Sequence, residues 1–247
     1  MKRDLINTGL LWLVLSILGW LLVLNWNIFP PALAREAEIV DNAFNLLMVL
    51  AVPVFTFIVA IMIYAAFRFR DPERTEDGPP IRETGRIMTA WLVVTVTLAA
   101  GILINPGFVG MAEIRAGGEP DIVIGITGQR WSWTISYPNG VDVTSYTGEL
   151  VLPVDNRIEF EITSLDPDVI HSVWIPAFRI KKDAVPGRIT QMFITPTETG
   201  SFEDDPNVRL QCAELCGLGH ATMAMKVRIV EQAEFDAYLD EILAEGS

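Results

Sequence analysis

The chain has 247 residues, of which 51% are hydrophobic, and its mean hydropathy of +0.36 is higher than that of an ordinary soluble protein. Its acidity is confined to one half: residues 109–247 contain 10 basic and 22 acidic residues, whereas residues 1–108 contain 8 and 9. Such an acidic surface repels a phosphate backbone, which excludes nucleic acid as a partner, and it favours a basic partner instead.

The first half contains three stretches without any charged side chain, at residues 5–34, 42–67 and 87–112. A helix of about 20 residues crosses the hydrocarbon core of a bilayer, so each stretch is long enough. Residues 1–112 are therefore predicted to form membrane helices over about 8–26, 44–67 and 87–108. Pro53 lies inside the second stretch, which is acceptable because membrane helices tolerate proline better than soluble helices do.

The first stretch also fits a second interpretation. Lys2 and Arg3, an apolar run and the Ala32-Leu33-Ala34 sequence together resemble a secretory signal with its cleavage site. The apolar run ends near Leu24, far from that site, which favours a third helix that is retained. The sequence leaves both interpretations open.

The distribution of basic residues predicts the orientation. The loop at 68–86 is rich in arginine, and loops of this kind stay in the cytoplasm. Three crossings then place residues 113–247 outside the cytoplasm. We expect a multi-pass protein of a bacterial inner membrane, with its C-terminal domain on the periplasmic or outer side.

After Ala116-Gly117-Gly118 the pattern changes to short strands separated by turns, at residues 121–127, 131–137, 149–154, 157–163, 169–175, 188–194 and 225–230. In one of them Ile158, Phe160 and Ile162 alternate with Glu159 and Glu161, which predicts one buried and one wet face. This many short strands predict a β-sandwich or barrel. An amphipathic helix ends the chain, with an apolar face of Phe235, Tyr238, Leu239, Ile242 and Leu243.

A cluster of metal-binding residue types lies near the end of this domain. Cys212, Cys216, His220 and Met223 lie close together in sequence, and the second histidine of the chain, His171, ends a predicted strand. A disulfide between the cysteines and a zinc site are alternatives. Thiolates, imidazoles and a thioether form a soft donor set that suits copper, whereas zinc has no use for the methionine. A blue-copper site needs only one cysteine, while two thiolates can bridge two copper ions.

The pattern C-x-E-x-C-x-x-x-H-x-x-M resembles that of subunit II of haem–copper cytochrome c oxidases, with its binuclear CuA centre. The resemblance extends to residues 168–176 (DVIHSVWIP) and 181–188 (KKDAVPGR), and it covers the outer domain and the two helices before it. It implies a membrane-anchored all-β fold: a transmembrane helical hairpin, here with a third helix, followed by a cupredoxin Greek-key β-barrel and a C-terminal helix.

The resemblance also implies roles for individual residues. Cys212 and Cys216 would bridge two copper ions, with His171 and His220 as terminal ligands. Met223 would be a weak ligand of one copper, and the backbone carbonyl of Glu214 would complete the other. In the family, the carboxylate at the Glu214 position also reaches a magnesium ion shared with subunit I.

Residues 128–133 (GQRWSW) match the aromatic strand of the family, in which the first tryptophan, here Trp131, accepts electrons from cytochrome c. Two positions depart from the family pattern: Ser132 replaces a tyrosine, and Met88 stands where a glutamate often helps to admit protons. Local packing and any proton role near the second position are therefore in doubt.

The resemblance implies an electron-accepting subunit of a respiratory oxidase, with oxygen reduced to water in subunit I. The expected partners are subunits I and III, the lipid bilayer, and cytochrome c or another soluble basic carrier. A membrane-tethered copper chaperone and a quinol-oxidase subunit without copper are the alternative functions.

Overall fold

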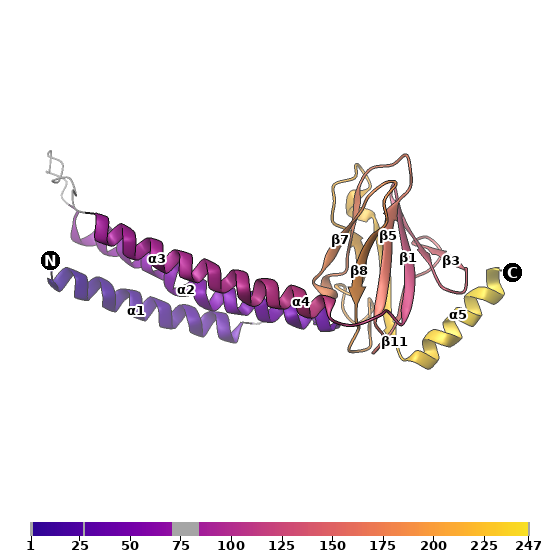
Figure 1. Ribbon diagram of the computed structural model, residues 1–247, viewed down its shortest axis with the longest axis horizontal. Coiled ribbons are helices and arrows are strands. Elements are labelled where there is room, and N and C mark those ends of the chain that lie inside the picture. The colour runs from indigo at the N-terminus through magenta and orange to yellow at the C-terminus, as the bar shows by residue number, and fades with distance from the viewer. Residues whose placement is uncertain (1, 27, 71–83, 247) are drawn as a thin grey trace. The chain divides into compact units, whose positions relative to one another are not determined.

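The computed structural model describes residues 2–26, 28–70 and 84–246 (Figure 1). The chain divides into two compact units, one made of residues 1–28 and 42–110 and the other of residues 29–41 and 111–247. The predicted cytoplasmic loop at 68–86 lies largely outside the described residues, because residues 71–83 are not among them.

The helical unit contains α1 (Lys2–Asn25), most of α2 (Arg35–Arg68) and α3 (Gly85–Ile102). The third helix continues through a π-helical segment (Leu103–Phe108), broken at Asn105, into α4 (Val109–Arg115). Within the described residues, three helices are long and apolar enough to cross a membrane, as predicted. Helix α2 begins at Arg35, before the membrane segment predicted over 44–67, because a charge-free stretch marks only the apolar part of a helix whose first turns carry Glu36 and Glu38.

Hydrogen bonds join α1 to α2 at the proline of α2. Pro53 has no N–H group, so the carbonyl of Val49, four residues earlier, has no partner within the helix. The indole of Trp20 donates a hydrogen bond to this carbonyl over 2.9 Å, and the indole of Trp12 donates to the Pro53 carbonyl over 2.8 Å. α1 thereby satisfies a backbone group that hydrocarbon cannot.

The second unit contains two sheets. The first has the order β3 (Asp142–Thr144), β2 (Ser132–Ser136), β1 (Ile122–Gln129), β5 (Ile158–Ser164) and β8 (Thr190–Ile194). The second has the order β4 (Leu150–Pro153), β11 (Ala224–Val230), β10 (Arg209–Cys212), β6 (His171–Trp174) and β7 (Lys181–Ala184), and β9 (Gly200–Ser201) also pairs with β11. The pairs β1–β5 and β4–β11 are parallel, and the other pairs are antiparallel. This is the predicted cupredoxin-like β-domain.

One hydrophobic core fills the space between these sheets, with Trp133, Phe160 and Phe178 among its largest buried side chains. The C-terminal helix α5 (Gln232–Gly246) packs Phe235 and Tyr238 against Tyr137, with ring centroids 6.2 Å and 5.8 Å apart. The predicted helix on the sheet is therefore confirmed. Its apolar face is shorter than predicted, because Leu243 is exposed beyond the edge of this contact.

The alternating pattern of β5 is correct for its apolar residues and wrong for Glu159. Ile158, Phe160 and Ile162 are fully buried, and Glu161 is exposed as predicted. Glu159 is buried too, because β5 lies between β1 and β8 and the amide of Gln191 on β8 donates a hydrogen bond to its carboxylate.

A connecting segment is fastened to the β unit. The backbone N–H of Leu33 donates to the Ala177 carbonyl over 3.1 Å, and the carboxylate of the buried Glu36 accepts the N–H of Thr195 over 2.9 Å. The guanidinium of Arg179 binds the Asp41 carboxylate through two nitrogens, at 2.7 Å and 3.0 Å. These contacts order residues 29–41 as part of the β unit.

Candidate metal centre

The predicted metal ligands converge at one end of the second sheet. His171 is the first residue of β6, and Cys212 is the last residue of the neighbouring strand β10. The loop that follows β10 returns to the sheet through a short 3-10 turn (His220–Thr222), and Met223 directly precedes β11. Antiparallel pairing therefore brings His171, distant in sequence, beside a loop that carries the other ligands.

The donor atoms form a continuous cluster. The sulfur of Cys212 lies 3.8 Å from Nδ1 of His171 and 3.8 Å from the sulfur of Cys216. The Cys216 sulfur lies 3.6 Å from Nδ1 of His220 and 3.9 Å from the sulfur of Met223. The carbonyl oxygen of Glu214 lies 3.2 Å from the Cys212 sulfur. All six predicted ligands thus lie together, each with its donor atom toward the cluster.

Both cysteines are free thiols and both are buried. Burial raises the pKa of the Cys216 thiol to about 11, and the neighbouring Cys212 acts in the same direction. A metal ion that binds here must therefore displace a proton. Once deprotonated, the two sulfurs, 3.8 Å apart, are close enough to bind the same metal ions.

A carboxylate lies on the far side of the His171 ring, beyond hydrogen-bond distance. The ring Nε2 lies 3.7 Å from the carboxylate of Asp168, which leaves Nδ1 facing the sulfurs. Burial lowers the pKa of His171, so the ring is neutral and ready to bind a metal, although the Asp168 carboxylate opposes this shift. A carboxylate behind a metal-binding histidine fixes the orientation and raises the basicity of the ring.

The Asp168 carboxylate is itself fixed by three donors. It accepts hydrogen bonds from the backbone N–H groups of Arg130 and Val169 and from the Arg130 guanidinium, at 2.8, 2.7 and 2.6 Å. Burial alone would raise the pKa of Asp168, but these donors outweigh it and hold the pKa below its ordinary value. Asp168 therefore stays charged behind His171.

Strand β1 approaches His171 closely at Gly128. A Cβ atom at this position would lie 3.0 Å from Cδ2 of His171 and 3.1 Å from Cζ3 of Trp133. The rings of Trp133 and His171 meet edge to face, with centroids 6.0 Å apart. A larger residue at 128 would push the ligand, so glycine is required by the close approach of the two strands.

Trp131 packs on the ligand loop. Its indole N–H donates a hydrogen bond to the Cys216 carbonyl over 3.1 Å, and the ring lies against Gly217 and Gly219. Between these glycines Leu218 is 99% exposed, so this side of the loop faces solvent in the isolated chain. A surface pocket of about 510 Å³ is lined by the Trp131 ring and by Leu165. The predicted electron acceptor therefore touches both the surface and a predicted ligand.

The sequence indicated the ligands but not the residues that hold them. Asp168, Arg130 and Gly128 were part of matching motifs without any assigned role. The spacing of Asp168 three residues before His171 is the signal that could have suggested its position. The side chain of Glu214 is exposed.

Known proteins resemble the chain over both units. The sequence model for "Cytochrome C oxidase subunit II, periplasmic domain" matches residues 144–230. Cytochrome c oxidase subunit 2 of Alkalihalophilus pseudofirmus is 30% identical over 243 residues, which cover 94% of this chain and 67% of that protein. The chain belongs to the cytochrome c oxidase subunit II family.

Subunit 2 of Cereibacter sphaeroides is 26% identical over 251 residues, covering 86% of this chain and 79% of that protein. A crystal structure of the periplasmic domain of subunit II from Bradyrhizobium japonicum is 30% identical, with a TM-score of 0.45, and covers 52% of this chain and 98% of that one.

Membership in the subunit II family makes the chain part of a haem–copper terminal oxidase, so other oxidase subunits are its partners. The family's periplasmic domain corresponds to the C-terminal β unit, and the apolar helices supply the membrane anchor. The soft Cys/His donor set fits a copper site in general.

Proposed function

We propose that this subunit accepts single electrons from a soluble carrier outside the cytoplasm and passes them through a binuclear copper centre to haem in subunit I. The observation that carries the proposal is the pair of free, buried cysteine sulfurs 3.8 Å apart, flanked by one histidine nitrogen on each side. A mononuclear blue-copper site uses a single cysteine, and a structural zinc site has no role for a thioether.

Each ligand has a defined task in this proposal. Cys212 and Cys216 bridge two copper ions, and His171 and His220 each bind one of them. Met223 and the Glu214 carbonyl supply the weaker contacts. The bound pair shares one unpaired electron between two metals, which spreads the change of charge on reduction.

The chain's own residues prepare the site for rapid transfer. The Asp168 carboxylate lies 3.7 Å behind the His171 ring, and Gly128 permits β1 to approach the ring closely. The indole of Trp131 connects the surface to the carbonyl of a bridging cysteine by a hydrogen bond. An electron that arrives at this ring is thus delivered to the bridging unit along a short route.

The acidic β unit favours a basic carrier such as a cytochrome c. We place the three apolar helices in the membrane, with loop 68–86 in the cytoplasm, and residues 113–247 outside together with residues 29–41, which belong to the β unit. Subunit I, which would reduce oxygen to water, and subunit III are the proposed partners within the oxidase. The exposed carboxylate of Glu214 is a ligand for a magnesium ion at the interface with subunit I.

Burial of both thiols argues against a copper chaperone, which needs exposed ligands for rapid exchange. The complete ligand set likewise argues against a copper-free quinol-oxidase subunit.

The decisive experiment is copper analysis and electron paramagnetic resonance of the purified full-length oxidase. Two coppers in this subunit and a seven-line hyperfine pattern are expected, and Cys212→Ser or Cys216→Ser should abolish the pattern. A four-line spectrum from one copper would refute the binuclear centre.

A further inference from the structure

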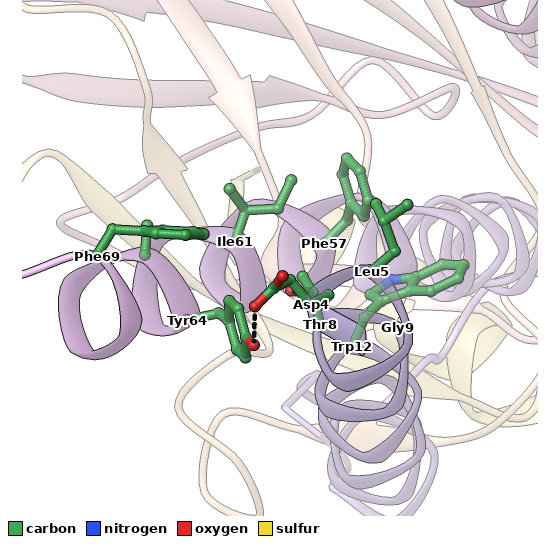
Figure 2. A pocket seen from close by; sticks show the side chains of 10 residues that line it. Asp4, Leu5, Thr8, Gly9, Trp12, Phe57, Ile61, Tyr64 and Phe69 are labelled. Atoms are coloured by element: carbon green, nitrogen blue, oxygen red, sulfur yellow. Dashed lines mark hydrogen bonds between the residues drawn. The ribbon is translucent and has the colours of Figure 1, made fainter. Parts of the chain in front are cut away.

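The helical unit contains a groove that the oxidase function does not use. It lies between α1 and α2, has a volume of about 540 Å³, and is lined mainly by apolar side chains such as Leu5, Trp12, Phe57 and Ile61 (Figure 2). These side chains remain between 37% and 70% exposed. The volume lies within the range of about 300–1,000 Å³ that is typical of small-molecule sites.

The groove is a built feature rather than a gap between loosely placed helices. The indoles of Trp12 and Trp20 bind backbone carbonyls of α2, and the buried hydroxyls of Ser16 and Thr56 lie 2.7 Å apart. Gly9 leaves a hollow in the wall, because a Cβ atom there would meet nothing within 4 Å. The helices are thus held at a distance that preserves the space.

One end of the groove is polar. Figure 2 shows the hydroxyl of Tyr64 bonded to the carboxylate of Asp4, a contact of 3.0 Å, and Arg68 binds the same carboxylate oxygen at 3.3 Å. Thr8 donates to the Asp4 carbonyl over 2.9 Å, so the polar groups within the groove bind each other. The apolar wall is consequently left to accept hydrocarbon.

Basic residues flank this end in the sequence. Lys2 and Arg3 directly precede Asp4 in α1, and Arg68, the last residue of α2, is followed two positions later by Arg70. The Arg68 side chain is 60% exposed and its guanidinium lies 5.7 Å from the ring centre of Phe69, which lines the groove. Its remaining N–H groups are therefore available at the rim, and a guanidinium pairs well with phosphate oxygens.

We propose that this groove binds an anionic glycerophospholipid of the bilayer, with an acyl chain along the apolar wall and its phosphate at Arg68. The excess of positive charge at the polar end selects an anionic headgroup over a zwitterionic one. Basic pockets between membrane helices at the cytoplasmic side recognise such lipids. The site is independent of the metal centre and depends on α1 remaining in the mature protein.

The test measures lipid binding by native mass spectrometry of the purified full-length oxidase, titrated with phosphatidylglycerol or phosphatidylcholine. Phosphatidylglycerol should bind more tightly, and Gly9→Leu should abolish binding of both lipids at this site because the new side chain fills the hollow. Gly101→Leu is the matched control, since a Cβ atom at Gly101 in α3 also meets nothing within 4 Å. Equal phosphatidylglycerol binding by the wild type and Gly9→Leu would overturn the proposal.

A second variant tests the headgroup. Arg68→Gln should weaken phosphatidylglycerol binding by about fivefold, the loss expected for one cation near an anionic surface, and leave phosphatidylcholine binding unchanged. Arg115→Gln, in α4, is the control and should leave both affinities unchanged. A preference for phosphatidylglycerol that is undiminished in Arg68→Gln would contradict the role of Arg68.

The occupant itself is identified by a photoreactive azidophenylalanine in place of Phe57. An adduct with the mass of phosphatidylglycerol supports the proposal, whereas an adduct with another oxidase subunit shows that a partner helix fills the groove. A mature subunit whose mass lacks α1 would also overturn it.

Discussion

Gly219→Ala is a small change that tests whether the position of Trp131 controls electron uptake. A Cβ atom at Gly219 would lie 2.5 Å from Cγ and Cδ2 of the Trp131 indole and 2.9 Å from its Cβ. The φ angle of Gly219 is −87°, which suits alanine, so the collision with the ring is the only obstacle. Non-bonded carbons prefer about 3.5–4.0 Å, so the indole must move by roughly 1 Å.

This displacement has a calculable cost. The hydrogen bond from the indole to the Cys216 carbonyl is 3.1 Å long and does not survive a shift of that size. Overpacking costs about 1–3 kcal/mol and the lost hydrogen bond about 1 kcal/mol. We therefore expect a loss of stability of about 2–4 kcal/mol, or a decrease in Tm of roughly 4–16 °C.

The assay compares rapid-mixing oxidation of a reduced cytochrome c by wild-type and Gly219→Ala oxidase, with copper content and spectrum measured on the same samples. No ligand is altered, so copper should be retained while electron uptake slows. Trp131→Phe is the comparison variant, because it keeps an aromatic ring, although a smaller one, and removes the hydrogen-bond donor without a collision at Gly219. A wild-type transfer rate in a folded Gly219→Ala oxidase would show that the packed indole is not the electron route.

The other predictions concern the metal, the donor and the fold. Met223→Leu should keep copper and shift the reduction potential, because a weak ligand tunes the centre; a variant without copper would contradict the weak-ligand role. Copper affinity of the metal-free protein should rise with pH below the Cys216 pKa of about 11, by about tenfold per unit for each thiol proton displaced, and proton release on copper titration checks this. The second-order rate with a basic donor should fall with added salt as the Debye length shortens from about 10 Å at 0.1 M to about 3 Å at 1 M, and a rate independent of salt points to apolar docking. Arg179→Met should destabilise the β unit by about 3–5 kcal/mol by leaving the half-buried Asp41 carboxylate without its cation, which denaturant unfolding would measure, and Asp41→Asn/Arg179→Met should recover part of the loss.

Features encoded by local sequence could be predicted, whereas those formed by distant contacts could not. The lengths of the charge-free stretches were sufficient to predict three apolar helices, and four donor residues of three types between Cys212 and Met223 were sufficient to propose a metal-binding loop. The strands β3, β7, β9 and β10 were missed because they are short and do not alternate clearly. β7, with the sequence KKDA, exposes three of its four residues and owes its strand conformation to pairing with β6.

The same limit applies to the groups around the site. The Asp168 carboxylate accepts a hydrogen bond from Arg130, 38 residues earlier, and the Val49 carbonyl accepts one from the indole of Trp20, 29 residues earlier. A buried carbonyl or carboxylate needs a hydrogen-bond donor, and here the fold supplies that donor from a distant part of the chain. A local sequence pattern therefore does not identify it. Glu159 is the clearest error of this kind, since its partner Gln191 became a neighbour only through strand pairing.

Four tryptophans, two in each unit, donate a hydrogen bond from the indole N–H to a backbone carbonyl of a distant segment. The indoles of Trp12 and Trp20 donate to α2, and those of Trp131 and Trp133 donate to the carbonyls of Cys216 and Met223. Each ring buries apolar area and uses its single N–H to fasten a segment distant in sequence. In the β unit the two fastened carbonyls belong to predicted copper ligands. Removal of either ring therefore disturbs the position of a ligand as well as any electron path through the ring. Gly219→Ala moves the Trp131 ring while every ring and every ligand stays in the chain, and the copper spectrum of the same sample shows whether the loss of the hydrogen bond to Cys216 has also moved a ligand.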